Sequence, residues 1–289
     1  MERITGKIFE EERAFFRASD AAVTDCVVKT GESPFKHSSG IRADGVTIAS
    51  KYPFWYSKNA AIANSVFEET ARAGVWYTDG VSVSDSKILA PKTFRRSRNV
   101  ALSRVAIPDA AETLWQCENV SVGEVDAKGD YLFMNSSGIV ADGLALDGRY
   151  AFDGSSDVTI RNSRLITKDA FWNTKNVVVY DSFISSEYVG WNSEGLTFVR
   201  CTIESLQGFC YVNGLRLVDC RLPDTTLAFE YSSVDADVRG GIESVLDPAS
   251  GRIKADRIGE LTVRGEFVDP GKTKIECADI GRISDEPRF

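Results

Sequence analysis

The sequence predicts an all-β protein, built as a single-stranded right-handed parallel β-helix with about 19 residues per coil. Apolar residues recur at steps of 19 or 20, and a residue that tolerates a positive φ angle precedes each of them. The residues that start the apolar segments are Val81, Val100, Val120, Ile139, Val158, Val177, Leu196 and Leu215. An internal repeat of this length is typical of solenoid architectures.

The position before each apolar start carries only glycine, asparagine or aspartate. The residues there are Gly80, Asn99, Asn119, Gly138, Asp157, Asn176, Gly195 and Gly214. These three residue types adopt the left-handed backbone region most readily. A chain that turns sharply at the same corner of every coil requires that property, so this series predicts a corner.

Each coil is expected to contain three short strands. A second apolar column follows two residues after the first, as in Val83 and Leu102, and this alternation is typical of a strand. Further apolar columns follow after a break of two residues, and a third segment carries a phenylalanine column that includes Phe133 and Phe171. The hexapeptide repeats of left-handed β-helices are missing, which favours the right-handed form. About eleven coils fit between Ala22 and Val234.

We expect one domain over residues 1–289 with a cap at each end. The stretch FEEERAFFRA, Phe9–Ala18, has helical spacing, which predicts an N-terminal helical cap over residues 1–20. Coils are expected over 21–234. From residue 235 the period is lost and DPASG and DPGK turns occur, which predicts a C-terminal strand-and-turn cap over 235–289.

Composition narrows the possible partners and the location. The formal net charge is −8, and the longest basic run is the short FRRSR, so we expect no nucleic-acid partner. No stretch approaches 18 apolar residues, so we expect no membrane association. The charged first residues lack the apolar region of a secretory signal, which predicts a cytoplasmic protein.

The cysteines and the acidic residues predict no cofactor and no metal site. The six cysteines contain no CxxC pair, the spacing that zinc sites use. Cys201 and Cys220 lie one repeat apart, which suits stacked buried thiols better than a disulfide. Asp142 and Asp157 belong to an aspartate-rich stretch that could bind calcium, but turn chemistry accounts for both.

Several segments carry a family resemblance: GVWYTDG, KDAFWNTKNVVVYDS, SEYVGWNSEGLTFVRCTI and FEYSSVDADVRGGI. They resemble a domain-of-unknown-function family of prokaryotic proteins with the pectin-lyase-like right-handed β-helix fold. The resemblance spans essentially the whole chain and implies that fold. It implies no catalytic residues, because the family has no established substrate.

The predicted ligand or partner site consists of tryptophans and asparagines on one stripe. All the tryptophans fall within one residue of the same coil position, beside an inward phenylalanine column. Successive side chains of a strand point to opposite faces, so tryptophans next to inward phenylalanines are expected to face outward. Local bulges would instead turn the rings into the core. Asparagines follow the stripe directly and either form a ladder between coils or face a ligand. The predicted site residues are Trp55, Trp76, Trp115, Trp172, Trp191, Asn135, Asn173 and Asn192.

The functional prediction is a non-catalytic β-helix that binds a glycan or a protein through this exposed aromatic stripe. One alternative is a pectin-lyase-type carbohydrate-active enzyme, either a polysaccharide lyase or a glycoside hydrolase. Against it, Asp181, Arg200 and Asp219 alternate in charge along one column, as a solvated salt-bridge ladder does, and the single histidine, His37, is expected to face solvent. The other alternative is a homo-oligomeric structural protein with the stripe as its interface.

Overall fold

The computed structural model describes residues 2–29 and 31–286, and the fold is an all-β parallel solenoid of about 15 turns with about 19 residues per turn. The chain divides into two units, residues 1–147 and residues 148–289. Because 15 turns are present, the predicted number of eleven was too low. Among the described residues, no helix has the length and apolar character needed to cross a membrane.

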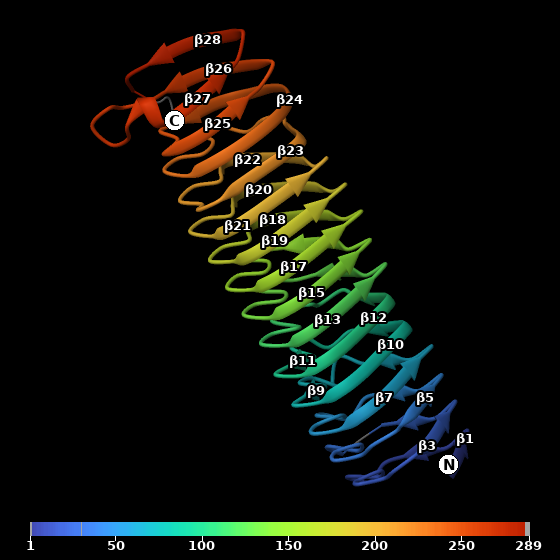
Figure 1. The fold of residues 1–289 in the computed structure, drawn as a ribbon. Coiled ribbons are helices and arrows are strands. Elements are labelled where there is room, and N and C mark those ends of the chain that lie inside the picture. Colours follow the sequence, from blue (N-terminus) through green and yellow to red (C-terminus); the bar gives the residue numbers. More distant parts are fainter. Residues whose placement is uncertain (1, 30, 287–289) are drawn as a thin grey trace. The chain divides into compact units, whose positions relative to one another are not determined.

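In the first unit, one column of parallel strands begins the coils and lies side by side in Figure 1. These strands are β1 (Glu2–Thr5), β3 (Ala21–Thr24), β5 (Arg42–Asp44), β7 (Lys58–Ala63), β10 (Asp79–Ile88), β12 (Arg98–Ile107), β13 (Glu118–Gly123) and β15 (Ser137–Asp142). The second column contains β2 (Ile8–Phe9), β4 (Val27–Val28), β6 (Thr47–Ile48), β8 (Val66–Phe67), β14 (Asp126–Lys128) and β16 (Ala145–Gly148). A third, short pair is β9 (Val75–Trp76) and β11 (Phe94–Arg95).

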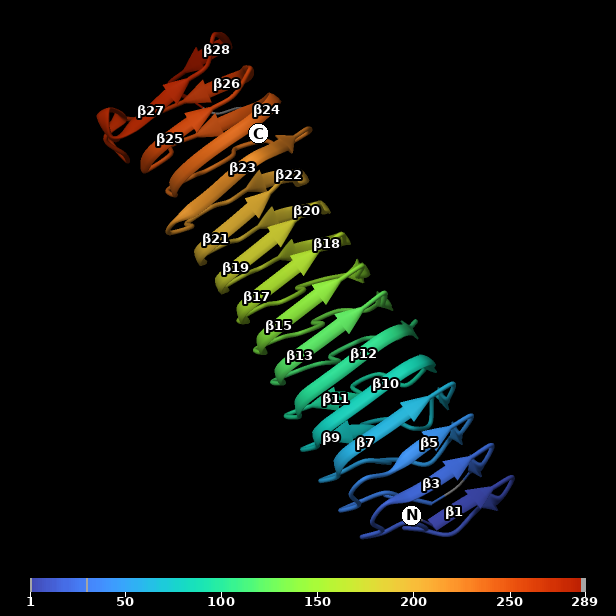
Figure 2. The same cartoon turned by 45° about the vertical axis from the view of Figure 1, so that its right-hand side comes forward.

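The second unit repeats this arrangement. Figure 2 shows β17 (Ser156–Arg161), β19 (Lys175–Tyr180), β21 (Glu194–Val199), β23 (Leu215–Leu222) and β24 (Ser233–Leu246) in one row. The second row contains β18 (Arg164–Ala170), β20 (Phe183–Val189), β22 (Thr202–Gly208), β26 (Arg257–Thr262) and β28 (Asp279–Ser284). The last coils add β25 (Ser250–Lys254), β27 (Thr273–Glu276) and one 3-10 turn, η1 (Pro270–Lys272).

The predicted apolar column is confirmed as a buried stack of parallel strands. In the first unit Val81 pairs with Val100, and Val120 pairs with both Val100 and Ile139. In the second unit an equivalent column runs from Val158 through Val177 to Leu196. All of these side chains are at most 3% exposed. Burial of this column on every coil supplies the hydrophobic stabilisation that holds successive turns together.

The predicted corner is also confirmed. Every glycine, asparagine and aspartate of that series has a positive φ, between 54° at Asn119 and 76° at Gly80. A second corner with positive φ lies two residues after the second apolar column of the coils, and it includes Asp85 at 50° within β10 and Arg104 at 53° within β12. The sequence indicated a break of two residues at this place but not its positive φ, because glycine, asparagine and charged residues, such as Gly143, Asn162 and Arg104, all occupy it.

Substitution of Gly195 tests the first corner. Its φ is 68°, and an added Cβ would lie 3.3 Å from Oδ1 of Asn176. We expect Gly195→Val to lower the free energy of unfolding by about 1–2 kcal/mol, because a β-branched residue is strained in the left-handed region. Gly195→Asn is the matched control and should cost less, since asparagine occupies this corner on other coils. Urea denaturation measures both, and an unchanged midpoint for the valine variant would contradict the corner assignment.

The predicted N-terminal helical cap is wrong. Residues 9–18 contain no helix; β1 already pairs in parallel with β3, and β2 with β4. Arg13 and Arg17 have φ values of 58° and 59°, and their amides donate to carbonyl oxygens of Glu32 and Lys36 on the next coil. The apolar spacing that suggested a helix instead places Phe15 on the inner phenylalanine ladder, where its ring stacks on Phe35 at 4.7 Å.

Parallel pairing also continues past the predicted end of the coils at residue 234. β24 pairs with β25 and β26, β25 pairs with β27, and β26 pairs with β28. The period becomes irregular there, since Val234 pairs with Gly251 and Gly251 pairs with Thr273. This irregular spacing explains why the sequence repeat fades although the coils continue.

Candidate functional site

The third corner of each coil in the first unit exposes two consecutive side chains, which form two adjacent columns. We call them the indole column, with Lys36, Trp55, Trp76, Arg95 and Trp115, and the tyrosine column, with His37, Tyr56, Tyr77, Arg96 and Gln116. The residue before the indole column is buried, as at Phe54 and Val75, so the chain turns outward directly after a core position. The residues of the tyrosine column all have φ between 48° and 58°.

Parallel ring stacking holds the indole column together. Trp55 and Trp76 stack with centroids 5.4 Å apart and planes 9° apart. The guanidinium of Arg95 lies between two indoles, 5.2 Å from the centroid of Trp76 and 4.8 Å from that of Trp115. Indole nitrogens of Trp55 and Trp76 donate to carbonyl oxygens of Ala73 and Lys92 at 2.6 and 2.8 Å. These rings are half-buried, so the predicted outward stripe is partly exposed and partly packed.

The tyrosine column is stacked in the same way. The ring of Tyr56 lies between His37, at 5.3 Å and 16°, and Tyr77, at 4.9 Å and 6°. Arg96 extends the column, because its Nη1 donates to the hydroxyl of Tyr77 at 3.1 Å and its Nε donates to Oε1 of Gln116 at 2.9 Å. His37 is exposed, as the sequence predicted, and it belongs to a regular coil.

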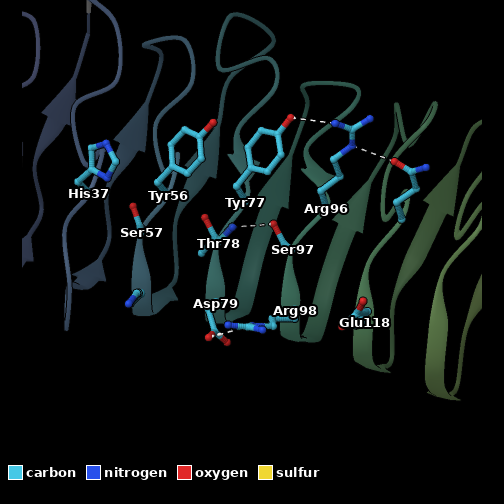
Figure 3. A pocket seen from close by; sticks show the side chains of 12 residues that line it. His37, Tyr56, Ser57, Tyr77, Thr78, Asp79, Arg96, Ser97, Arg98 and Glu118 are labelled. Atoms are coloured by element: carbon cyan, nitrogen blue, oxygen red, sulfur yellow. Dashed lines mark hydrogen bonds and ion pairs between the residues drawn. The ribbon is translucent and has the colours of Figure 1, made fainter.

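A groove of about 620 Å³ runs beside the tyrosine column (Figure 3). The tyrosine column forms one side of it. Its base contains the buried hydroxyl residues Ser57, Thr78 and Ser97, each of which donates to a backbone carbonyl. Charged residues at the start of the first strands form the opposite side: Lys58, Asp79, Arg98 and Glu118. We call this feature the tyrosine groove.

Neighbouring side chains stabilise the ionised form of Asp79 in the groove. Nδ2 of Asn99 donates to its Oδ1 at 2.7 Å, and Nε of Arg98 lies 3.0 Å from its Oδ2. The hydrogen bond from Asn99, followed by the hydrogen bond and charge of Arg98, holds the pKa of Asp79 below its ordinary value. Asp79 is therefore ionised at neutral pH and acts as a hydrogen-bond acceptor.

Stacking decides which parts of the aromatic rings a ligand can contact. Parallel stacking at 4.9–5.4 Å covers the ring faces of Tyr56 and Trp76 with neighbouring side chains. Tyr56 is 42% exposed although its faces are covered, whereas the indole nitrogen of Trp76 already donates to the carbonyl oxygen of Lys92. The first unit therefore offers a ligand a row of hydroxyl, guanidinium and amide groups along ring edges, in place of a flat indole platform.

The predicted tryptophans of the second unit pack differently. Trp172 and Trp191 are half-buried, with centroids 6.3 Å apart and planes at 62°. An edge-to-face contact of this kind gives no continuous platform across adjacent coils.

The predicted asparagines are exposed at the corner that follows the tryptophan position. Nδ2 of Asn192 donates to Oδ1 of Asn173 at 2.8 Å, and Nδ2 of Asn173 donates to Oδ1 of Asp153 at 3.3 Å. These bonds form the ladder that the sequence suggested for them. In the first unit, Asn135 is exposed with φ of 53° at the same position of its coil.

The alternating charged column forms exposed salt bridges between neighbouring coils, as predicted, and Asp219 pairs with Arg239. Arg104 donates to both carboxylate oxygens of Asp85, at 2.6 and 2.8 Å, and Arg200 donates to both of Asp181, at 2.7 Å each. These residues sit at the second positive-φ corner and are exposed. Exposed pairs of this kind contribute little to stability, and nothing in their geometry points to catalysis.

The cysteines agree with the prediction of unpaired thiols. Cys26, Cys117, Cys201, Cys210 and Cys220 are free and buried, and Cys277 is free and partly exposed. The thiols of Cys201 and Cys220 donate to backbone carbonyls one coil apart, of Val179 and Phe198.

The sequence did not reveal the tyrosine column. Its members, His37, Tyr56, Tyr77, Arg96 and Gln116, differ in residue type, so no single residue repeats. A signal was present, because they occupy the same coil position as Asn135, one residue after the tryptophan stripe.

These features define the class of protein as a parallel β-solenoid with stacked side-chain columns on its outer corner. The family model described as "Protein of unknown function (DUF3737)" matches residues 2–276, and the chain belongs to this family. Comparison with curated proteins and with solved structures gives no match.

Proposed function

We propose that the protein is a non-catalytic glycan-binding β-solenoid and that a linear glycan lies along the tyrosine groove. One observation supports this proposal most strongly. Polar groups of the tyrosine column recur on successive coils along the groove. A linear glycan repeats its hydroxyl groups along its length, so a groove with repeating donors and acceptors can bind several sugars in the same way.

Arg96 is the central residue of the proposed site. Tyr77 and Gln116 fix its guanidinium through Nη1 and Nε, and the ring of Tyr77 lies 5.9 Å from its Cζ. A side chain that is already ordered loses less conformational entropy when a ligand binds. The guanidinium has five N–H donors, and two protein bonds leave donors for sugar hydroxyls or for the carboxylate of an acidic sugar.

Binding without cleavage fits the protonation state of Asp79. Glycoside hydrolysis uses a protonated carboxylic acid to donate to the leaving oxygen and a second carboxylate opposite it. Asn99 and Arg98 lower the pKa of Asp79, which disfavours the protonated form. Asp79 is therefore unsuited to the role of general acid, and its place in the groove suits an acceptor for sugar hydroxyls.

A glycan array with purified protein tests the proposal, using Arg96→Ala and Arg104→Ala as a matched pair. Both variants remove an exposed arginine of the first unit, but Arg104 pairs with Asp85 at a different corner. We expect Arg96→Ala to weaken binding of the array hits tenfold or more, because hydrogen bonds to charged groups contribute about 1.5–3 kcal/mol. Arg104→Ala should bind as wild type does.

The other outcomes would contradict this proposal in different ways. Equal losses in both variants would mean that binding does not depend on the tyrosine groove. If the array shows no hit and light scattering shows self-association that changes in Arg96→Ala, the groove is a subunit interface. Cleavage of a bound oligosaccharide would show that the protein is an enzyme.

A further inference from the structure

A second cavity, in the unit of residues 148–289, combines aromatic rings with a buried carboxylate. Its volume is about 280 Å³, and its lining consists of Tyr150, Lys168, Asp169, Trp172, Tyr188 and Trp191. We call it the Asp169 pocket. It lies outside the tyrosine groove and uses different residues.

Strand register places Asp169 between two tyrosines. Asp169 on β18 pairs directly with Tyr188 on β20, so their side chains point to the same face of neighbouring strands. Ala151 pairs with Ala170, which puts Tyr150 beside Asp169 on the preceding coil. The column therefore reads tyrosine, aspartate, tyrosine on three successive coils.

Asp169 is a largely buried residue that lines the pocket, and its carboxylate has no hydrogen-bond partner among the described residues. The residue is 5% exposed, and within the described part of the chain its carboxylate makes no ion pair either. Burial raises the pKa of Asp169 above its ordinary value. A largely buried carboxylate without hydrogen bonds destabilises the folded protein, so Asp169 does not help to hold the coils together.

Two of the ring contacts around Asp169 are edge-to-face, unlike the parallel stacks of the first unit, and the contact between Tyr150 and Trp172 is stacked. Tyr188 and Trp191 meet at 5.4 Å and 82°, and Trp172 and Trp191 meet at 6.3 Å and 62°. Tyr150 lies 6.3 Å from Trp172 at 27°. Because edge-to-face contacts cover fewer ring faces than parallel stacking does, the rings can direct their electron-rich faces toward a bound group.

Lys168 does not cancel the negative charge of Asp169 in this pocket. Its ammonium lies 3.6 Å from a carboxylate oxygen of Glu187, which balances its charge. The carboxylate of Asp169 and the ring faces therefore leave a small site that favours positive charge.

We propose that the Asp169 pocket binds a small methylated ammonium cation. Ring faces attract such cations by cation–π interaction, and the carboxylate supplies the opposite charge. A methylated ammonium needs no hydrogen-bond acceptors, whereas a primary ammonium has three donors to satisfy. The lining offers one carboxylate and the phenol oxygens, which suits the methylated group better. A neutral sugar would bring no positive charge to Asp169, beside which the charge of Lys168 is offset by Glu187.

Calorimetric titration of the full chain with choline, with tetramethylammonium and with 3,3-dimethylbutanol tests this proposal. The last compound has the shape of choline with carbon in place of the charged nitrogen. We expect both cations to bind and the neutral analogue to bind at least tenfold more weakly. Failure of both cations to bind, or equal binding of choline and its neutral analogue, would overturn the proposal.

Two matched variants locate the site. Asp169→Asn should weaken choline binding at least tenfold and leave the melting temperature unchanged or higher, because it removes an unpartnered buried charge. Asp181→Asn removes an exposed carboxylate of the same unit that pairs with Arg200, and it should bind choline as wild type does. Trp172→Leu gives a second test if Asp169→Asn folds poorly, and it should also lose binding. Full affinity in a folded Asp169→Asn or Trp172→Leu variant would contradict the assignment.

Discussion

Replacement of Phe54 by alanine is expected to lower the free energy of unfolding by about 3–5 kcal/mol. The Phe54 side chain is 0% exposed. Its ring stacks on Phe35 with centroids 4.6 Å and planes 3° apart, and it contacts Phe67 at 6.3 Å. A solenoid is stabilised by contacts between neighbouring coils, so removal of one ring of the inner ladder weakens the interfaces on both sides.

Phe54→Leu is the control, since it keeps most of the volume and should cost less than about 1.5 kcal/mol. Equilibrium urea unfolding, followed by near-UV circular dichroism, measures both variants. A loss below about 1 kcal/mol for Phe54→Ala would show that the inner ladder does not hold the coils together. A loss for Phe54→Leu as large as that for alanine would show that ring stacking, and not filled volume, carries the stability.

Trp76→Ala is expected to have the second largest effect, a loss of about 2–3 kcal/mol. A large aromatic side chain buries about 150–250 Å² when fully covered, and Trp76 is half-buried, so the loss lies below that of a core ring. The variant removes the stack on Trp55, the contact with Arg95 and the hydrogen bond to the carbonyl oxygen of Lys92.

The measured loss of stability shows whether the tryptophan stripe supports folding or is only a surface. Trp76→Phe keeps a stacked ring and is the control, expected to lose about half as much as the alanine variant. If Trp76→Ala unfolds at the same urea concentration as wild type, the stripe contributes nothing to folding and is only a surface. If it loses as much as Phe54→Ala, the indole is a core residue.

The regular coils could be predicted from the sequence because their corners restrict residue choice. Only residues that accept a positive φ, such as Asn99 and Gly138, fit the first corner, and the adjacent column must be apolar. The N-terminal helix was a wrong prediction because FEEERAFFRA has the apolar spacing of a helix. In the fold, the amides of Arg13, Phe15 and Arg17 bond to the next coil, a long-range pairing that local spacing does not show.

The candidate sites could be predicted only in part. The tryptophans do share one position and are half-exposed, as their parity indicated. The tyrosine groove was missed because stacking depends on shape and backbone angle, and His37, Tyr77 and Arg96 satisfy both with different chemistry. Asp169 was missed because the residue pattern does not show that β18 pairs it with Tyr188 and buries it beside Trp172 and Trp191.

Affinity as a function of oligosaccharide length tests most directly the central claim, that a glycan lies along the tyrosine groove. Calorimetric titration with galacturonan and cello-oligosaccharides, from the disaccharide to the octasaccharide, gives this dependence. The groove extends over successive coils from His37 to Glu118. We therefore expect affinity for the preferred series to rise with each added sugar until the groove is filled and then to level, and we expect Arg96→Ala to flatten the rise. Equal affinity for the disaccharide and the octasaccharide, or no binding of either series at any length, would contradict the claim.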